Sequence, residues 1–433
     1  MNVLNRYAAA FKQIEDKAER FRFLLIQCFI FSLPFDRLYS SVILILLSVV
    51  SVFDINLDKL KSIPRQFLIF QSLYLLSLLW YFMSYHKQSA GFVLEKQMAL
   101  FLFPLILPLA INFDAEKLKT SIKTLCAATI TALLYLFTCV IWEVVFDLQL
   151  PISSTLSSGL YFNHQFSKPL DIHAGYLSLY VAMAIVFLIR TFKRQLPLKN
   201  KLLLLIALVL LFVGMFFLAS RNTILAVCFI LLFVMPFFRL KKKFRYFSVM
   251  IVLLVIGFLV VNKVPYLKQR FSSEMVMDLN SNAGITGIEN FKVLEPRFDR
   301  WSAAMDLVKQ SPLLGFGTGD EEAMLKTAYM QNGLYISYIL AFNAHNQYLS
   351  VLIKHGFVGL IILLLSLFYY FRLAIQARDF MYLSFLLFMG IGFFTENILD
   401  ANKGIFFFAL FNTFFGYHCL KKRKITKSHS AVD

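Results

Sequence analysis

Two arginines and a histidine lie in or beside a long segment, residues 263–345, that is too polar to cross a bilayer. Arg297 and Arg300 are three residues apart and therefore share a face of the helix predicted over 296–310. His345 stands at the start of a second helical pattern. A guanidinium group binds phosphate oxygens through paired hydrogen bonds, and a neutral imidazole can act as a general base. These residue types predict a site that holds a phosphorylated group beside a hydroxyl.

A third arginine, Arg221, separates two apolar blocks in the sequence FFLASRNTILA. A charged side chain beside hydrocarbon is costly, so its presence indicates a functional site by default. An arginine that reaches from the end of a span to the lipid headgroups is the alternative. Most basic residues at the ends of apolar blocks lie on the opposite predicted face. This exception favours a role for Arg221 beside Arg297.

Other polar residues near these three also have plainer interpretations. Gly315, Gly317 and Gly319 in SPLLGFGTGD could present backbone N–H groups to an anion, or could simply form a tight turn. His345 could merely cap the short amphipathic helix that follows it at the outer interface and ends at Gly356. The residues that we predict to bind substrate around the three are Arg300, Trp301, Asn346, Tyr348 and Glu396.

The sequence carries no cofactor motif. His164 and His173 are nine residues apart and could form part of a metal site, but Asp36 is a lone acid at the outer ends of the early apolar blocks. Glu396 in FFTENILD could pair with an arginine at the site or form a structural salt bridge. Walker A, GxSxG and HExxH motifs are all missing from the sequence. We therefore expect no metal, no ATP and no other cofactor.

Composition indicates the class of protein that carries this site. Hydrophobic residues make up 59% of the 433 positions and charged residues 16%, whereas soluble domains are about a quarter charged. A bilayer span needs about 20 apolar residues. The first, second and fourth apolar blocks are short or contain proline, so eleven spans are an alternative to twelve. We predict an all-α polytopic membrane protein with about twelve transmembrane helices, at 21–35, 38–53, 66–84, 97–112, 121–147, 173–192, 201–219, 222–239, 245–262, 356–377, 380–397 and 402–420.

The net charge of +18 is distributed as an orientation signal. With a cytoplasmic N-terminus, the predicted inside segments carry 28 of the 43 lysines and arginines, as the positive-inside rule requires. The long outside loop 263–345 holds eight basic and nine acidic residues and is nearly neutral. We therefore expect cytoplasmic N- and C-termini, contact with membrane lipids and no nucleic acid partner.

The order of the motifs resembles a known family. Arg297 and Trp301 form an R-x-x-x-W pattern that precedes SPLLGFGTG and AHNQYLSVLIKHGFVG, and ASRN surrounds Arg221. Over roughly residues 200–415 this order is similar to the O-antigen ligase/polymerase family of bacterial membrane glycosyltransferases, which act on undecaprenyl-diphosphate-linked glycans. The resemblance implies a GT-C-like fold of twelve spans with a long helical periplasmic loop. It also implies essential roles for Arg221, Arg297 and His345, without a metal or ATP.

Three regions follow from the predicted topology. Residues 1–262 would hold the first nine transmembrane helices, with a periplasmic loop at 148–172. Residues 263–355 would form a periplasmic loop region with short helices, in which the polar stretch 271–293 predicts an irregular loop. Residues 356–433 would add the last three spans and a basic cytoplasmic tail. No internal repeat is present, which counts against a transporter built from repeats.

The resulting hypothesis is an O-antigen ligase-like, metal-independent inverting glycosyltransferase of the bacterial inner membrane, with its active site facing the periplasm. It would move a polysaccharide from undecaprenyl diphosphate to a hydroxyl of the lipid A-core. The arginines would hold the diphosphate and His345 would activate the acceptor. A polymerase of O-antigen or polysaccharide repeat units and a protein O-oligosaccharyltransferase are the enzyme alternatives. A flippase or transporter of lipid-linked glycans is the non-enzyme alternative.

Overall fold

The computed structural model describes residues 14, 16–53, 61, 63–147, 149, 160–192, 195–239, 243–279 and 295–429, which contain no β-strand. The helices before residue 240 are α2 (Lys17–Ser32), α3 (Arg37–Val52), α5 (Phe67–Tyr81), α6 (Lys87–Ala110), α7 (Ala115–Trp142), η1 (Glu143–Asp147), α9 (His164–Ser167), η2 (Lys168–Leu170), α10 (Ala174–Thr191), α11 (Leu198–Leu218), α12 (Arg221–Phe229), η3 (Ile230–Val234) and α13 (Met235–Arg239). The later helices are α14 (Lys243–Lys263), α15 (Pro265–Lys268), η4 (Gln269–Ser273), α16 (Glu274–Leu279), α17 (Arg297–Gln310), α18 (Glu321–Gln331), α19 (Tyr335–Ile339), α20 (Gln347–Gln376), α21 (Phe380–Gly392), η7 (Ile398–Asp400) and α22 (Asn402–His429).

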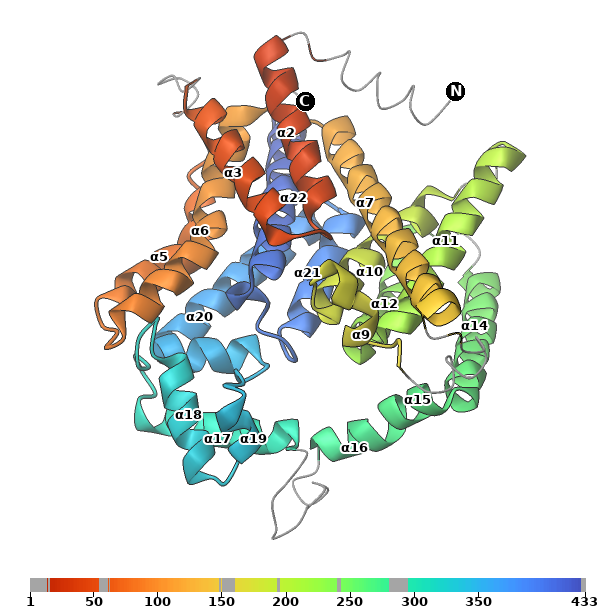
Figure 1. The fold of residues 1–433 in the computed structure, drawn as a ribbon. Helices are drawn as coiled ribbons and strands as arrows, with labels where there is room; N and C mark the ends of the chain where they lie inside the picture. The colour runs from red at the N-terminus through yellow and green to blue at the C-terminus, as the bar shows by residue number, and fades with distance from the viewer. Residues whose placement is uncertain are drawn as a thin grey trace.

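Each predicted span falls on a helix. Helices long and apolar enough to cross a membrane are α6, α7 with η1, α10, α11, the part of α14 from Tyr246, and α20. The shorter apolar helices α3, α5, α12 with η3, and α21 coincide with four further predicted spans. The two remaining predicted spans, the first and the twelfth, fall on α2 and α22. The all-helical prediction is confirmed, and the six long apolar helices agree with a polytopic membrane protein (Figure 1).

Side-chain exposure separates the helices at the centre of the bundle from those at its edge. On α10, Leu177 and Tyr180 are fully buried. On α11, Leu202 and Ile206 are more than half exposed, and α14 shows the same pattern at Phe258. Contiguous apolar surface is unfavourable in water and favourable against lipid tails. The exposed faces of α11 and α14 are therefore the faces that lipid would cover.

Several predicted spans differ from the observed helices at one end, among them those of α6 and α21. α6 begins at Lys87, well before the predicted start at 97, because its first turns are helical but too polar to be counted as apolar span. α21 ends at Gly392, whereas the predicted span ran to 397. The chain leaves the helix there because the Phe393 carbonyl accepts a hydrogen bond from the Gln347 backbone N–H, 2.8 Å away. Glu396 consequently lies in a loop beyond the helix end.

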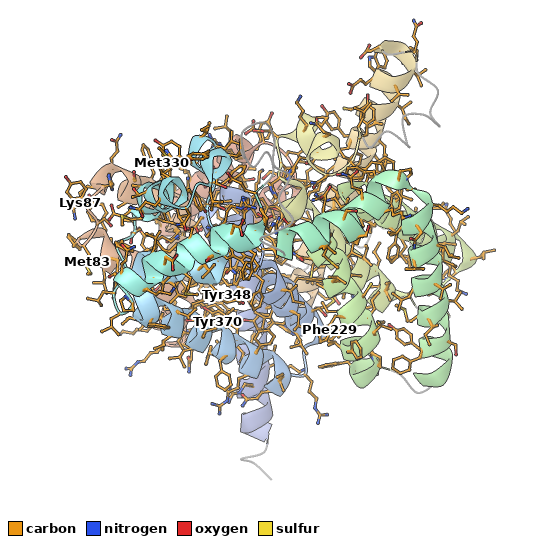
Figure 2. All side chains as sticks on the ribbon, turned by 90° about the horizontal axis from the view of Figure 1, so that it is seen from below. Met83, Lys87, Phe229, Met330, Tyr348 and Tyr370 are labelled. Carbon is orange, nitrogen blue, oxygen red and sulfur yellow. The ribbon has the colours of Figure 1, made fainter. Side chains whose placement is uncertain are left out.

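Helices α15 to α19 form a second layer on one side of the bundle, below it in Figure 1. These helices fall within the predicted loop region 263–355. A separate apolar core joins α17 and α18 to the start of α20, with Ala304, Leu307, Tyr329 and Ile353 among its buried members. Seen from below, α15, α16 and α17 run in an arc across this face (Figure 2). The arc carries the ends of α16 and α17 toward the centre of the molecule.

Two predicted loops contain helical turns. The irregular loop predicted over 271–293 is wrong for 271–279, which are helical in η4 and α16 because Phe271 packs against an apolar cluster that includes Phe162 and Leu267. The remainder of that stretch lies outside the described residues. Similarly, the described part of the loop predicted at 148–172 contains α9 and η2.

The glycine-rich segment after α17 is a packing turn. The backbone N–H groups of Phe316 and Gly317 donate to the carbonyls of Ile353 and Lys354, each at 2.9 Å. A Cβ on Gly315 would stand 2.6 Å from the Ile353 carbonyl oxygen, so only glycine fits. Because these N–H groups already have acceptors, the turn interpretation is favoured over the anion cradle.

The short helix predicted to end at Gly356 is the first part of α20. Gly356 has a φ of 62° and kinks the helix there, in agreement with a glycine-terminated segment. Residues 349–355 are all buried against the rest of the protein, so this segment is not a surface helix with one exposed polar face. Its predicted position at the membrane interface stays a prediction. Lys354, 2% exposed, lies 2.6 Å from the Asp400 carboxylate and 3.3 Å from that of Glu321. This buried ion cluster ties α18, α20 and η7 together.

Candidate active site

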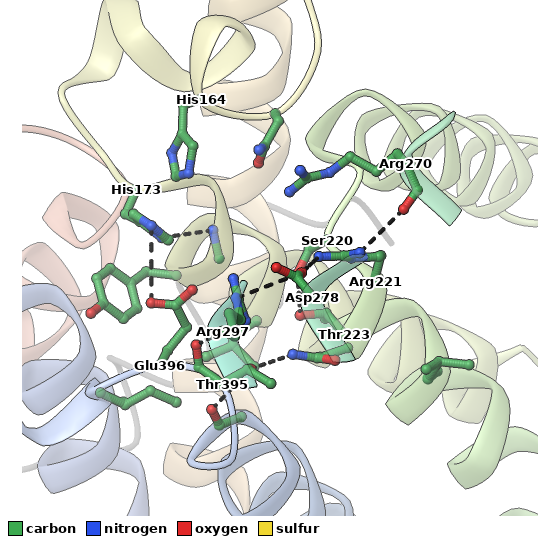
Figure 3. Close-up of a pocket in the computed structure, with 18 of the residues that line it drawn as sticks. His164, His173, Ser220, Arg221, Thr223, Arg270, Asp278, Arg297, Thr395 and Glu396 are labelled. Atoms are coloured by element: carbon green, nitrogen blue, oxygen red, sulfur yellow. Dashed lines mark hydrogen bonds and ion pairs between the residues drawn. The ribbon is translucent and has the colours of Figure 1, made fainter. Parts of the chain in front are cut away.

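A polar cavity of about 240 Å³ lies where α9, α10, α12, α16, α17 and the loop after α21 meet (Figure 3). The charged and imidazole side chains that line it are those of Arg221, Arg270, Arg297, Asp278, Glu396, His164 and His173. Other polar lining residues include Asn163, Ser220, Asn222, Thr223 and Thr395. We call the part around Asp278 and the three arginines the arginine end, and the part around Glu396 and the two histidines the histidine end.

Two helix starts position the arginines. Arg221 is the first residue of α12, placed there by a left-handed turn at Ala219, which has a φ of 44°. Arg297 is the first residue of α17, and its Nη1 donates to the Thr395 carbonyl at 3.4 Å. Both guanidinium groups are only partly exposed, 13% for Arg221 and 23% for Arg297. Partial burial strengthens their attraction for an anion, because less water screens the charge.

Asp278 lies between the two arginines (Figure 3). Its Oδ2 is 2.5 Å from Arg221 Nη2 and 3.8 Å from Arg297 Nε. Arg270 pairs separately with Glu274, at 2.7 Å, and its backbone carbonyl accepts from Arg221. One carboxylate oxygen thus occupies the point on which two guanidinium groups converge, which identifies that point as an anion position.

His173 caps the N-terminus of α10. Its Nδ1 accepts the Gly175 backbone N–H at 3.1 Å, so in the neutral ring the proton is on Nε2. That Nε2 lies 4.0 Å from Glu396 Oε2, and the His164 ring packs against His173 with centroids 4.2 Å apart. Burial lowers the pKa of His173, and a neutral ring at pH 7 follows.

His345 approaches the same carboxylate oxygen of Glu396 as His173 does. Its Nδ1 is 3.5 Å from Glu396 Oε2. Burial by itself would raise the pKa of Glu396, but the nearby His345 and the interactions with His173 and Arg297 lower it to about 2. Glu396 is therefore ionised. The alternative role of His345 as a helix cap is wrong, because the Asn346 side chain accepts the N–H groups at the start of α20.

The structure brings together five of the eight predicted site residues. Arg221, Arg297, Trp301 and Glu396 line the cavity, and His345 contacts Glu396. The Trp301 indole N–H donates to the Ala344 carbonyl at 3.0 Å, and thereby holds the residue before His345.

The other three predicted residues are held elsewhere. Arg300 is 8% exposed and its guanidinium lies over the Phe342 ring, 5.3 Å from the centroid. The Asn346 side chain caps α20, and the Tyr348 hydroxyl donates to the Gly390 carbonyl at 3.0 Å. Of the two neighbouring arginines, Arg297 is therefore the one that faces the cavity.

Sequence reasoning missed several lining residues. Asp278 and Arg270 lie in the stretch from 263, where the sequence signal was only a mixture of charges without a motif. Asn222 follows Arg221 directly and its amide hydrogen-bonds the Thr395 hydroxyl. The i,i+4 pair of Arg270 and Glu274 was a local signal for a helix here. No local signal connects Asp278 with Arg221.

A buried hydrogen-bond network holds the Glu396 loop against the segment that follows His345. The Asn346 backbone N–H donates to Asn397 Oδ1 at 2.8 Å, and Leu399 N–H donates to the Gln347 side chain at 2.6 Å. The ion cluster of Lys354 lies directly beneath, since Ser350 contacts both of its carboxylates. Distant parts of the chain therefore fix the relative positions of His345 and Glu396.

Comparison with known proteins relates this geometry to a family. Residues 206–364 match the family described as O-antigen ligase. No curated protein matches the chain. The matched segment contains Arg221, Arg297 and His345, and Glu396 lies beyond it. The match over residues 206–364 confirms the predicted resemblance of this chain to the O-antigen ligase/polymerase family.

Proposed function

We propose that this protein is an inverting glycosyltransferase that moves a polysaccharide from undecaprenyl diphosphate to a hydroxyl acceptor on the periplasmic face of the bacterial inner membrane. The observation that carries the proposal is the convergence of Arg221 and Arg297 on one carboxylate, with Glu396 at the other side of the same cavity. His345 contacts Glu396 from outside the residues that line the cavity. The family match supports a ligase or polymerase reaction in general. The predicted charge distribution supports the periplasmic location.

The arginine end would bind the donor diphosphate. Each charge-assisted hydrogen bond contributes about 1.5–3 kcal/mol, and two guanidinium groups can offer several. Charge accumulates on the diphosphate as it leaves the sugar, so fixed cations there favour the transition state over the bound donor. To enter, the diphosphate must displace Asp278 from Arg221 and Arg297.

The histidine end would serve the acceptor. His345 would take the hydroxyl proton as the acceptor oxygen forms a bond to the anomeric carbon of the donor sugar. The bond between that carbon and the diphosphate oxygen breaks on the opposite face, which inverts the configuration and releases undecaprenyl diphosphate. Because the arginines offset the leaving group's charge, the proposed reaction requires no metal.

The lipid A-core is the acceptor in our leading proposal. A second lipid-linked glycan would make the protein a repeat-unit polymerase, and a serine or threonine side chain would make it a protein O-oligosaccharyltransferase. All three acceptors offer a hydroxyl and require the same base. A flippase would instead move the lipid-linked glycan without breaking a bond, and an ionisable cluster with one acid between two imidazoles favours chemistry over transport.

Glycan transfer by the purified full-length protein tests the proposal. We expect the protein in lipid nanodiscs to transfer glycan from a lipid-linked donor to lipid A-core, and His345→Ala to abolish transfer without unfolding. Arg297→Lys should lower the rate at least tenfold, since the planar fork is lost. Arg378→Lys, far from the cavity, is the matched control. Donor consumption with a glycan or peptide acceptor alone would reassign the acceptor, and no transfer to any of them would refute the enzyme.

A further inference from the structure

We infer that Glu396 is a positioning residue that acts through His345, by accepting its Nδ1–H and so presenting Nε2 as the basic nitrogen. The inference rests on the proposed function and deepens it. The sequence had suggested that Glu396 binds substrate or forms a structural salt bridge. Its surroundings favour this third role.

The first argument is the position of the carboxylate. Glu396 Oε2 is 3.5 Å from His345 Nδ1, and this nitrogen is buried without a closer hydrogen-bond partner in the part of the chain that the structure describes. A buried polar atom without a partner is costly, so the carboxylate is the acceptor that satisfies it. Hydrogen bonds to catalytic bases are often long in the unliganded state and shorten when substrate binds.

The second argument concerns the proton on the ring. A neutral imidazole carries its proton on one nitrogen, and a facing carboxylate favours that proton on the nearer one. With Nδ1–H toward Glu396, the lone pair of His345 is on Nε2, where it can take a hydroxyl proton. The imidazolium that then forms is stabilised by the adjacent negative charge.

The third argument is that His173 leaves this charge available. Its Nδ1 is already occupied by the Gly175 N–H, so the ring presents Nε2–H to Glu396, at 4.0 Å, as a neutral donor. At this distance His173 makes no hydrogen bond to the carboxylate, and as a neutral ring it does not neutralise the charge. Hydrogen bonds from Gln347 to Phe393 and from Asn346 to Asn397 fix the loop on both sides of Glu396.

The fourth argument separates this role from donor binding. A carboxylate repels a diphosphate, and Glu396 lies at the end of the cavity away from the contacts that Asp278 makes with Arg221 (Figure 3). Glu396 is also only 19% exposed, so its charge is poorly screened. Its favourable partner in the reaction is the cation that develops on His345.

The test compares Glu396→Gln with Glu396→Asp in the transfer assay. Glutamine keeps the size and removes the charge, so we expect kcat to fall by about 100- to 10,000-fold, the range typical of general-base machinery. The donor KM should stay within about threefold, and Glu396→Asp should recover part of kcat. Glu322→Gln, an acid that is 68% exposed on α18, is the control and should leave kcat unchanged.

A double substitution keeps the result interpretable if Glu396→Gln is less stable. In a His345→Ala background, residual transfer should not fall further when Glu396 is also changed, because the two residues act as a unit. Unchanged kcat in Glu396→Gln, a loss confined to the donor KM, or additive losses would each overturn the inference. Those outcomes leave the proposed function intact, whereas a wild-type protein that transfers no glycan would refute the proposed function itself.

Discussion

Replacing Asp278 with asparagine should tighten the binding of a diphosphate to the arginine end. Asp278 Oδ2 contacts Arg221 Nη2 at 2.5 Å and Arg297 Nε at 3.8 Å, so an incoming anion competes with a carboxylate for the same two cations. Asparagine has nearly the same shape and no charge. It therefore leaves the guanidinium groups of Arg221 and Arg297 free to bind an incoming anion.

The size of the effect follows from the burial of the pair. Two charges about 4 Å apart interact with about 4 kcal/mol at an effective dielectric constant of 20, but the net value of a charged hydrogen bond is about 1.5–3 kcal/mol. Asp278 is 21% exposed and Arg221 13%, so water screens part of the attraction and the lower half of that range applies. Since 1.4 kcal/mol is a factor of ten, we expect the Kd for diphosphate to fall about 10- to 30-fold.

Calorimetric titration of the purified full-length protein with inorganic pyrophosphate, and then with a short isoprenyl diphosphate, measures this change. Asp306→Asn is the matched control, because Asp306 is 48% exposed and pairs only with surface Lys309. Without ligand, Asp278→Asn should also lower the melting temperature, as two partly buried arginines lose their counter-ion, and pyrophosphate should restore it. Equal or weaker diphosphate binding by Asp278→Asn would refute the view that Asp278 occupies the donor position.

Two further predictions concern stability. Lys354→Met leaves the buried carboxylates of Asp400 and Glu321 without their cation, so we expect the free energy of unfolding to fall by about 3–5 kcal/mol. The melting temperature should then fall strongly, and a fall of only a few degrees would contradict this expectation. The lowered pKa of His173 contributes stability that is complete above pH 6.5 and is lost as the pH falls below that value. Glu396, with a pKa near 2 against an ordinary 4.5, contributes about 3 kcal/mol that is lost as the pH falls from 4.5 toward 2. Melting curves from pH 7 to 3 should show both losses, and Glu396→Gln should remove only the one below pH 4.5.

The helices could be predicted because their signals are local. Apolar blocks marked the positions of the apolar helices, and the spacing of apolar residues after Pro296 predicted the helix that the structure has at Arg297–Gln310. A hydropathy pattern could not find the polar start of α6, because its residues are too polar to count as apolar span. It also missed the helical turns at 271–279, which pack against an apolar cluster. Residue types alone pointed to arginines and a histidine as the chemical groups.

Tertiary structure decided which of these groups meet. Arg297 and Arg300 share a helix face in sequence, but packing places Arg300 on the Phe342 ring and leaves Arg297 at the cavity. The partners of the arginine pair and of His345 are Asp278 and Glu396, which no motif marks. Periodicity records only which residues share a face of one helix. Contacts between distant segments depend on how helices pack. The sequence by itself therefore determined which chemical groups are present, and the tertiary structure determined which of them lie together.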